Sequence, residues 1–191
     1  DTWEDSFGHL FYSIPYSHYI LKLEYRFIGE QLADARKMRW AWRNSGVMVH
    51  AQSPDKMALN QDFPVSIEVQ LLGASESEAR STGNLCTPGT HVRIDNRLIT
   101  QHCINSSSYS FLGYQWVELE LEVRGNNMIR HFINGGLVMQ YSSPELDTWS
   151  FASRKTDQYI SGNKNLGDGY IAIQSESHPV QFRNIKLLPL L

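Results

Sequence analysis

The sequence has no apolar run near the roughly 20 residues needed to cross a bilayer, so we expect no transmembrane segment. It also has no excess of positive charge, since the formal net charge is -3 and its lysines and arginines are scattered. Nucleic acid binding needs clustered positive charge, which argues against DNA or RNA as a partner. With 191 residues, 41% of them hydrophobic, the chain can bury a core, and we expect one domain spanning residues 1–191.

The local motifs of many enzyme families are missing as well. The chain has no GxSxG elbow, Walker loop, GxGxxG turn or HExxH spacing. Cysteine is scarce, and the two cysteines, Cys86 and Cys103, lie in turn-rich surroundings. They suit either a disulfide across a loop or two partly buried free thiols. A zinc site that includes His102 is disfavoured because there is no CxxC pair.

β-Strand patterning, by contrast, is abundant. Alternating or β-branched apolar residues run through 19–27, 46–50, 65–72, 116–123, 128–133, 170–174 and 180–187. Asn126 and Gly135 lie in short connections that tolerate positive φ, as tight antiparallel turns require. No segment of helical length keeps a 3.6-residue apolar stripe. The pattern predicts an all-β sandwich or jelly roll of two antiparallel sheets.

The alternation also separates core positions from a polar face. In 46–50, Val47 and Val49 indicate core, whereas Met48 and His50 fall on the opposite face. If three such strands are neighbours, six polar side chains converge: Asn44, His50, Glu68, Gln70, Gln174 and Glu176. Their amides and carboxylates would suit sugar hydroxyls. Alternatively, the polar side chains of each strand form a solvated outer face that binds no ligand.

Several short sequence motifs occur here in the same order as in one known family. They are Asn44-Ser45-Gly46-Val47-Met48, Ile67-Glu68-Val69-Gln70-Leu71, Asn134-Gly135, and Ile173-Gln174 followed by Phe182-Arg183-Asn184-Ile185. From about Tyr19 to the C-terminus the chain resembles the 3-keto-disaccharide hydrolase domain family. The resemblance implies the concanavalin A-like jelly-roll fold and, because that bacterial family is mostly exported, a location outside the cytoplasm. The chain departs from the commonest family pattern at His50 and Glu176.

The resemblance further implies a glycoside substrate with a ketone at C3 of the sugar ring, cleaved by base-assisted elimination and hydration. Such a reaction needs a base, a group that stabilises the enolate, and an acid for the leaving group. We expect Glu68 and His50 to serve as base and enolate stabiliser, with Glu176 as the acid. The expected substrate-binding residues are Asn44, Gln70, Gln174, Trp42 and His178. A divalent metal bridging some of His50, Glu68 and Gln70 would polarise the ketone, but neither spacing nor resemblance fixes such ligands.

Two other functions fit the same residues. Ordinary glycoside hydrolysis by two carboxylates needs Glu68 and Glu176 roughly 5–9.5 Å apart. A non-catalytic, lectin-like carbohydrate-binding module would use the same polar row without a base, because a fold alone does not determine a function. The glycan, its linkage and anomer, and the oligomeric state stay open at this point.

Overall fold

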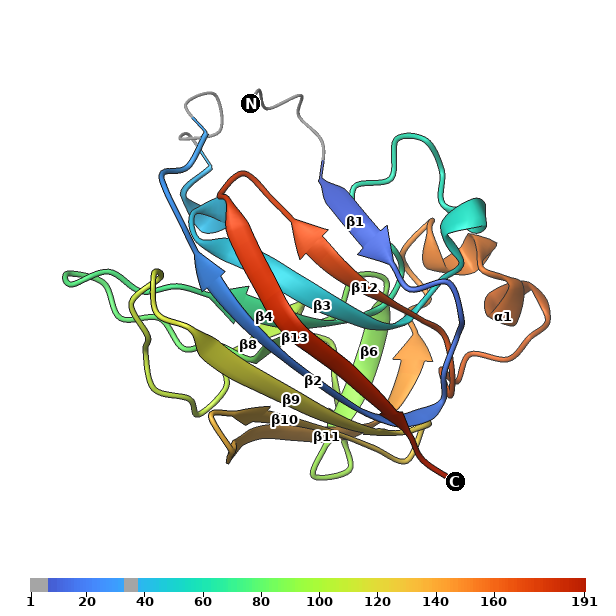
Figure 1. Ribbon diagram of the computed structural model, residues 1–191. Helices are drawn as coiled ribbons and strands as arrows, with labels where there is room; N and C mark the ends of the chain where they lie inside the picture. Colours follow the sequence, from blue (N-terminus) through green and yellow to red (C-terminus); the bar gives the residue numbers. More distant parts are fainter. Residues whose placement is uncertain (1–6, 33–37) are drawn as a thin grey trace.

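The protein is described by a computed structural model that covers residues 7–32 and 38–191. Within these residues the strands form two antiparallel sheets stacked as a sandwich (Figure 1). The six-stranded sheet has the order β1-β12-β3-β4-β5-β8, and the seven-stranded sheet has the order β13-β2-β9-β10-β11-β6-β7. This arrangement confirms the predicted all-β sandwich.

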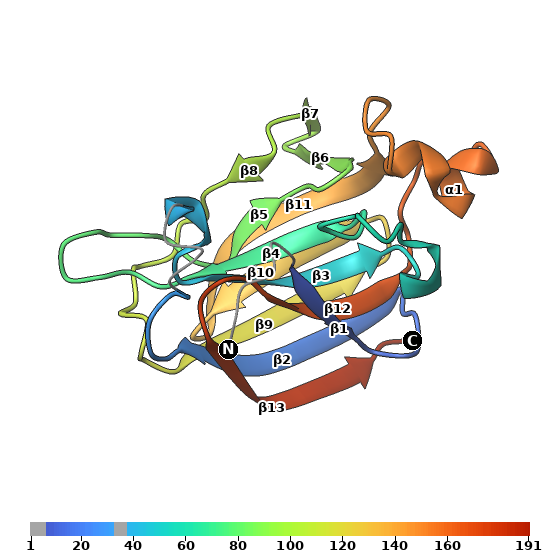
Figure 2. The same ribbon diagram turned by 90° about the horizontal axis from the view of Figure 1, so that it is seen from above.

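Each sheet combines strands from distant parts of the chain, as Figure 2 shows from above. The strands of the six-stranded sheet are β1 (Gly8–Phe11), β12 (Tyr170–Ser175), β3 (Asn44–Ala51), β4 (Ile67–Leu72), β5 (Asn84–Cys86) and β8 (Cys103–Ile104). Those of the seven-stranded sheet are β13 (Val180–Pro189), β2 (His18–Phe27), β9 (Val117–Arg124), β10 (Met128–Ile133), β11 (Gly136–Leu146), β6 (Thr90–Ile94) and β7 (Arg97–Ile99).

Among the described residues, helical structure is limited to short turns at the ends of strands and in loops. These are α1 (Asp157–Ile160) and the 3-10 turns η2 (Arg39–Ala41), η3 (Pro54–Lys56) and η4 (Ser153–Lys155). Across the part of the chain that the structure describes, no helix has the length and apolar character needed to span a membrane.

The core lies between the two sheets and follows the alternation of the sequence. Val47 and Val49 of β3 are fully buried there, together with Ile67 and Val69 of β4. The partners of these side chains come from the facing sheet, where Leu119 of β9 belongs to the same buried cluster. The intervening residues of β3 and β4 therefore point to the outer face of the six-stranded sheet.

At His50, however, β3 contains a bulge that interrupts this alternation. Met48 pairs with Ala172 and Ala51 with Tyr170, so the register shifts by one residue between them. His50 has a φ of 49°, and its Nε2–H donates to the carbonyl of Gly125, 3.1 Å away in the turn between β9 and β10. A bulge redirects a side chain in this way. The prediction that His50 shares the outer face with Met48 is wrong.

A disulfide ties the edge of the six-stranded sheet together. Cys86 of β5 and Cys103 of β8 are bonded, with their Cα atoms 4.2 Å apart, and they are direct partners in the strand register. Of the alternatives that the sequence left open, the structure shows the disulfide. It fixes a two-residue edge strand, which on its own has few hydrogen bonds to hold it.

Candidate functional site

A cavity of about 360 Å³ lies on the outer face of the six-stranded sheet, over β3, β4 and β5. We call it the carboxyl cavity. It is lined by Trp40, Asn44, Phe63, Glu68, Gln70, Arg80, Cys86, Pro88, His102, Cys103 and Glu176. The structure therefore brings together four of the predicted residues, Asn44, Glu68, Gln70 and Glu176.

The floor of the cavity depends on the Asn44-Ser45-Gly46 segment of β3. A Cβ on Gly46 would lie 2.7 Å from Oε1 of Glu68, closer than real Cβ atoms approach, and 3.1 Å from Oε1 of Gln174, a tight contact. The absent side chain thus gives Glu68 and Gln174 room to meet over β3. On the same segment, Asn44 donates to the carbonyl of Trp40 at 3.1 Å, and Ser45 donates to the carbonyl of Gln174 at 2.7 Å. Each residue of the motif positions part of the site.

The two carboxyl groups of the cavity are buried and close enough to influence each other. Glu68 and Glu176 are each 6% exposed. Burial raises the pKa of the Glu68 carboxyl to about 8. The pKa of Glu176 is raised to about 9, chiefly by burial and also by the charge of Glu68, while the charge of Arg80 acts in the opposite direction. A pair with such pKa values can hold one proton between them at mildly alkaline pH, which suits acid–base chemistry.

Several polar atoms around the cavity have no hydrogen-bond partner among the described residues. They are Oδ1 of Asn44, both side-chain polar atoms of Gln174, and Oε2 of Glu176. Gln174 is 1% exposed and lies beside Glu68 across Gly46. Buried polar groups are usually satisfied, so these atoms are the ones that a polar ligand would satisfy.

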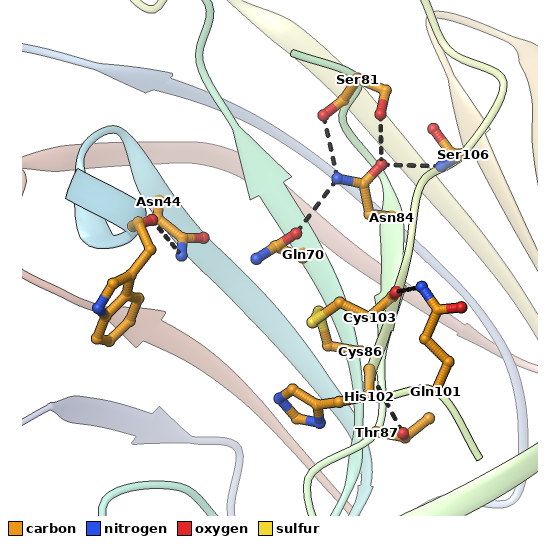
Figure 3. The surroundings of a disulfide bond; sticks show 11 residues. Asn44, Gln70, Ser81, Asn84, Cys86, Thr87, Gln101, His102, Cys103 and Ser106 are labelled. Atoms are coloured by element: carbon orange, nitrogen blue, oxygen red, sulfur yellow. Dashed lines mark hydrogen bonds between the residues drawn. A yellow bond between two sulfur atoms is a disulfide. The ribbon is translucent and has the colours of Figure 1, made fainter. Parts of the chain in front are cut away.

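A hydrogen-bond network fixes the wall on the β5 side (Figure 3). Asn84 donates to Oε1 of Gln70 at 3.2 Å and to the carbonyl of Ser81 at 3.1 Å. In return, the Ser81 hydroxyl and the Ser106 backbone N–H both donate to Oδ1 of Asn84, at 2.8 and 2.9 Å. Asn84 therefore connects β4, the loop before β5 and the loop after β8.

Aromatic side chains and the disulfide form the rest of the wall. Trp40 is 51% exposed at the cavity mouth. The Phe7 ring lies 5.8 Å from that of Trp40 and stacks on Phe63 at 4.7 Å. His102 and the Cys86–Cys103 bond lie beside Gln70, opposite Asn44 (Figure 3). The cavity thus combines a polar floor with an apolar rim, the usual composition of a small-molecule site.

Of the other predicted residues, Gln174 lies beside Glu68, whereas Trp42, His178 and His50 lie elsewhere. Trp42 and His178 face one another edge to face at 6.2 Å and line a separate recess of about 460 Å³ with Arg43. His50 is buried on the core side, 3.1 Å from Gly125, and does not line the carboxyl cavity. The predicted pairing of His50 with Glu68 is therefore wrong, and the physical reason is the bulge in β3.

Arg80 is a cavity residue that the sequence did not single out. It lies in the loop 73–83 between β4 and β5, and its Nη1 donates to the carbonyl of Trp42 at 2.5 Å. The Ser-rich, charged composition of 74–81 predicted a long loop that could shape a site. No spacing in the sequence showed that Arg80 of this loop contacts Trp42, just before β3.

A metal site does not emerge from these residues. Within 7–32 and 38–191, no three His, Cys, Asp or Glu side chains gather in a way that could hold an ion. The set suggested from the sequence combined His50 with Glu68 and Gln70, and His50 lies on the other side of the sheet. The residues present therefore do not form the expected ligand set.

Two stacked antiparallel sheets with a cavity on the outer face of one define the chain as a concanavalin A-like jelly-roll sandwich. More narrowly, it belongs to the family of 3-keto-alpha-glucoside-1,2-lyase-like domains, which matches residues 1–188. The family resemblance inferred from the short sequence motifs is thereby confirmed.

Solved structures share the fold at low sequence identity. Two structures from Parabacteroides distasonis ATCC 8503, both described as candidate glycosyl hydrolases, have a TM-score of 0.58 and 16% identity. One match covers 97% of this chain and 84% of the other, and the second covers 100% and 78%. The carbohydrate-binding module CBM66 from Bacillus subtilis has a TM-score of 0.52 and 9% identity, over 97% and 84% of the two chains. A search among curated proteins found no match.

Proposed function

We propose that this chain binds a carbohydrate in the carboxyl cavity and cleaves a glycoside whose ring carries a ketone at C3. The observation that carries the proposal is the pair of buried carboxyl groups, Glu68 and Glu176, beside unsatisfied amides. Membership of the 3-keto-alpha-glucoside-1,2-lyase-like family supports the same reaction class.

A ketone at C3 changes how the glycosidic bond can break. It acidifies the hydrogen on C2, so a base can remove that proton and the electron pair of the C–H bond enters an enolate. When the ketone re-forms, a C1–C2 double bond forms and the C1–O bond breaks. The departing oxygen takes a proton from an acid. Addition of water to the enone then completes a net hydrolysis.

The two carboxyl groups match the two proton transfers. Glu68 has the lower pKa, about 8, and is the base that takes the C2 proton. Glu176, with a pKa of about 9, keeps its proton longer and is the acid that protonates the leaving oxygen. Such a pair gives a bell-shaped dependence of kcat/KM on pH, with its maximum between these two values.

The amide groups supply recognition of the sugar. Asn44 and Gln174 have acceptor atoms without partners in the part of the chain that the structure describes, and Gln70 is oriented by Asn84. Such groups hydrogen-bond well to sugar hydroxyls. The exposed face of Trp40 at the mouth provides an apolar surface on which a sugar ring can stack.

The test is turnover of a 3-keto glycoside, followed by NMR, by the wild-type chain and by Glu68→Gln. We expect the variant to fold and to lose about 10²–10⁴-fold in kcat, because a neutral amide cannot accept the C2 proton. Full activity of Glu68→Gln would remove Glu68 from the mechanism. Asn127→Gln, in the β9–β10 turn outside the cavity, serves as the matched control.

Passive sugar binding is the competing function, and one observation favours it: the amides and Trp40 would bind a sugar equally well without chemistry. Calorimetry with plain and 3-keto sugars separates the two. Binding of plain glycans with no turnover of either sugar would support the lectin-like function. Turnover of an unmodified glycoside would instead support ordinary two-carboxylate hydrolysis.

We also propose that the chain functions outside the cytoplasm. The disulfide between Cys86 and Cys103 supports this, because such bonds persist in oxidising compartments. Thiol labelling of the protein isolated from its native compartment tests the proposal. Quantitative labelling of both cysteines without prior reduction would contradict it.

A further inference from the structure

The proposed reaction needs a positive group that the sequence-based assignment does not supply. Removal of the C2 proton places negative charge on the ketone oxygen, and a preorganised donor has to stabilise it. His50, the expected donor, lies behind the sheet. Among the described residues that line the carboxyl cavity, Arg80 is the one with a permanent positive charge.

Arg80 is held in place by contacts outside the cavity. Its Nη1 donates to the carbonyl of Trp42 at 2.5 Å, and its guanidinium lies 5.8 Å from the centre of the Trp42 ring. Arg43 also lies over that ring, at 4.5 Å, and donates to the carbonyl of Ala74. The Trp42 ring therefore packs against two guanidinium groups, those of Arg43 and Arg80. These contacts hold the start of β3 against the loop 73–83.

The C-terminal end of the same loop is anchored separately. Asn84 and Ser81 exchange two hydrogen bonds, so the residue next to Arg80 is fixed to β5 (Figure 3). One of the five N–H groups of the guanidinium is used by Trp42. Preorganised stabilisation of an anion requires donors that are already held in position. The anchored backbone next to Arg80 and the remaining N–H groups of its half-buried guanidinium meet this requirement.

The charges around Arg80 couple it electrostatically to one of the two cavity carboxyl groups. The charged groups that act on its guanidinium are Glu78 of the same loop, Glu176, and Arg43, which directly precedes β3. Arg43 repels Arg80 and is itself bonded to Ala74. On Glu176, burial and Glu68 raise the pKa and Arg80 lowers it. Arg80 is thus coupled to the acid of the proposed pair.

We propose that Arg80 is a further catalytic residue, whose guanidinium binds the C3 ketone oxygen and carries the negative charge of the enolate. This proposal rests on the proposed function. In the step, the C2 proton goes to Glu68, the C–H electron pair forms the C2–C3 double bond, and the oxygen charge is shared with Arg80. When the ketone re-forms, the C1–O bond breaks and Glu176 protonates the leaving oxygen.

The test compares Arg80→Gln and Arg80→Lys with a matched control, Arg154→Gln. Arg154 also donates to a tryptophan carbonyl, that of Trp149 at 2.7 Å, but it lies outside the cavity. We expect Arg80→Gln to lower kcat about 10²–10³-fold. Arg80→Lys should recover part of that loss because it keeps the charge, and Arg154→Gln should retain wild-type turnover.

Two further readouts separate catalysis from folding. Without the cation, the pKa of Glu176 rises, so the alkaline limb of the pH–rate profile should move to higher pH in Arg80→Gln and stay in place in Arg80→Lys. In calorimetry, the wild type should prefer the 3-keto sugar to its 3-hydroxy counterpart, and Arg80→Gln should lose that preference. Wild-type kcat in Arg80→Gln, or an unchanged ketone preference, would overturn the assignment. Lack of turnover by the wild type would overturn the proposed function instead, and the binding comparison would still decide the role of Arg80.

Discussion

Gly46 shows how one missing side chain organises a site. The two polar groups that flank it, Glu68 and Gln174, come from β4 and β12, the strands on either side of β3. Both extend over β3 because Gly46 leaves the surface free. The burial that raises the pKa of Glu68 to about 8 follows from this packing. A small residue here is therefore required by the packing of Glu68 and Gln174, since backbone conformation alone does not demand it.

Gly46→Ala tests this role directly. The new methyl group would meet Oε1 and Cγ of Glu68 at 2.7 and 3.0 Å, so the carboxyl must move. Displacement of a catalytic group by about 1 Å costs on the order of 10²-fold in turnover, which is the expected loss. Gly136→Ala is the control, because its Cβ would make an ordinary contact of 3.5 Å. Equal activity of the two variants would exclude the packing role of Gly46.

At the scale of elements, the disulfide ties β8 to β5 at the edge of the cavity. Removing it with Cys86→Ala and Cys103→Ala releases a closed loop with a sequence separation of 17 residues. A loop of this size is worth about 3 kcal/mol, which for a chain of this length lowers Tm by about 10 °C. Thermal unfolding followed by circular dichroism measures the change. The wild type in reductant should lose the same stability; no effect of reductant on Tm would contradict this account.

The alternation of apolar and polar residues predicted the strands and the core, because it follows directly from strand geometry. It placed Val47 and Val49 inside and Glu68 outside correctly. The alternation did not predict two features of the site. The bulge at His50 is a local conformation with a φ of 49°, and no glycine marks it in the sequence. The position of Arg80 depends on how the loop 73–83 packs on Trp42, which is a tertiary contact without a periodic signal.

For the whole molecule, buried titratable groups make stability depend on pH in two opposite ways. Burial raises the pKa values of Glu68 and Glu176 above their unfolded values, so their contribution is full at low pH and is lost as pH rises toward 8–9. Burial lowers the pKa values of His131 and His178 to about 4, so their contribution is lost as pH falls from 6.5 through 4. Stability should therefore be greatest between about pH 4.5 and 6.5.

Urea unfolding at pH 5.5 and pH 8.5 measures the alkaline side of this dependence. We expect the wild type to lose on the order of 4 kcal/mol over this interval, because the two buried carboxyl groups cost about 7 kcal/mol and His131 and His178 return about 3 kcal/mol. The double variant Glu68→Gln and Glu176→Gln should lose no stability, since its amides do not titrate and the contribution of the histidines grows up to pH 6.5. An equal loss in both proteins would show that the two carboxyl groups are not buried as described.

The central claim is that the two-carboxyl cavity breaks a glycosidic bond by removing the C2 proton of a 3-keto sugar. The kinetic isotope effect on kcat/KM for a 3-keto glycoside with deuterium at C2 tests it most directly. Proton removal by Glu68 predicts a large primary effect, because the C2–H bond breaks in a slow step. Turnover of this substrate with no more than a small secondary effect would contradict the account, because direct displacement at C1 leaves the C2–H bond intact.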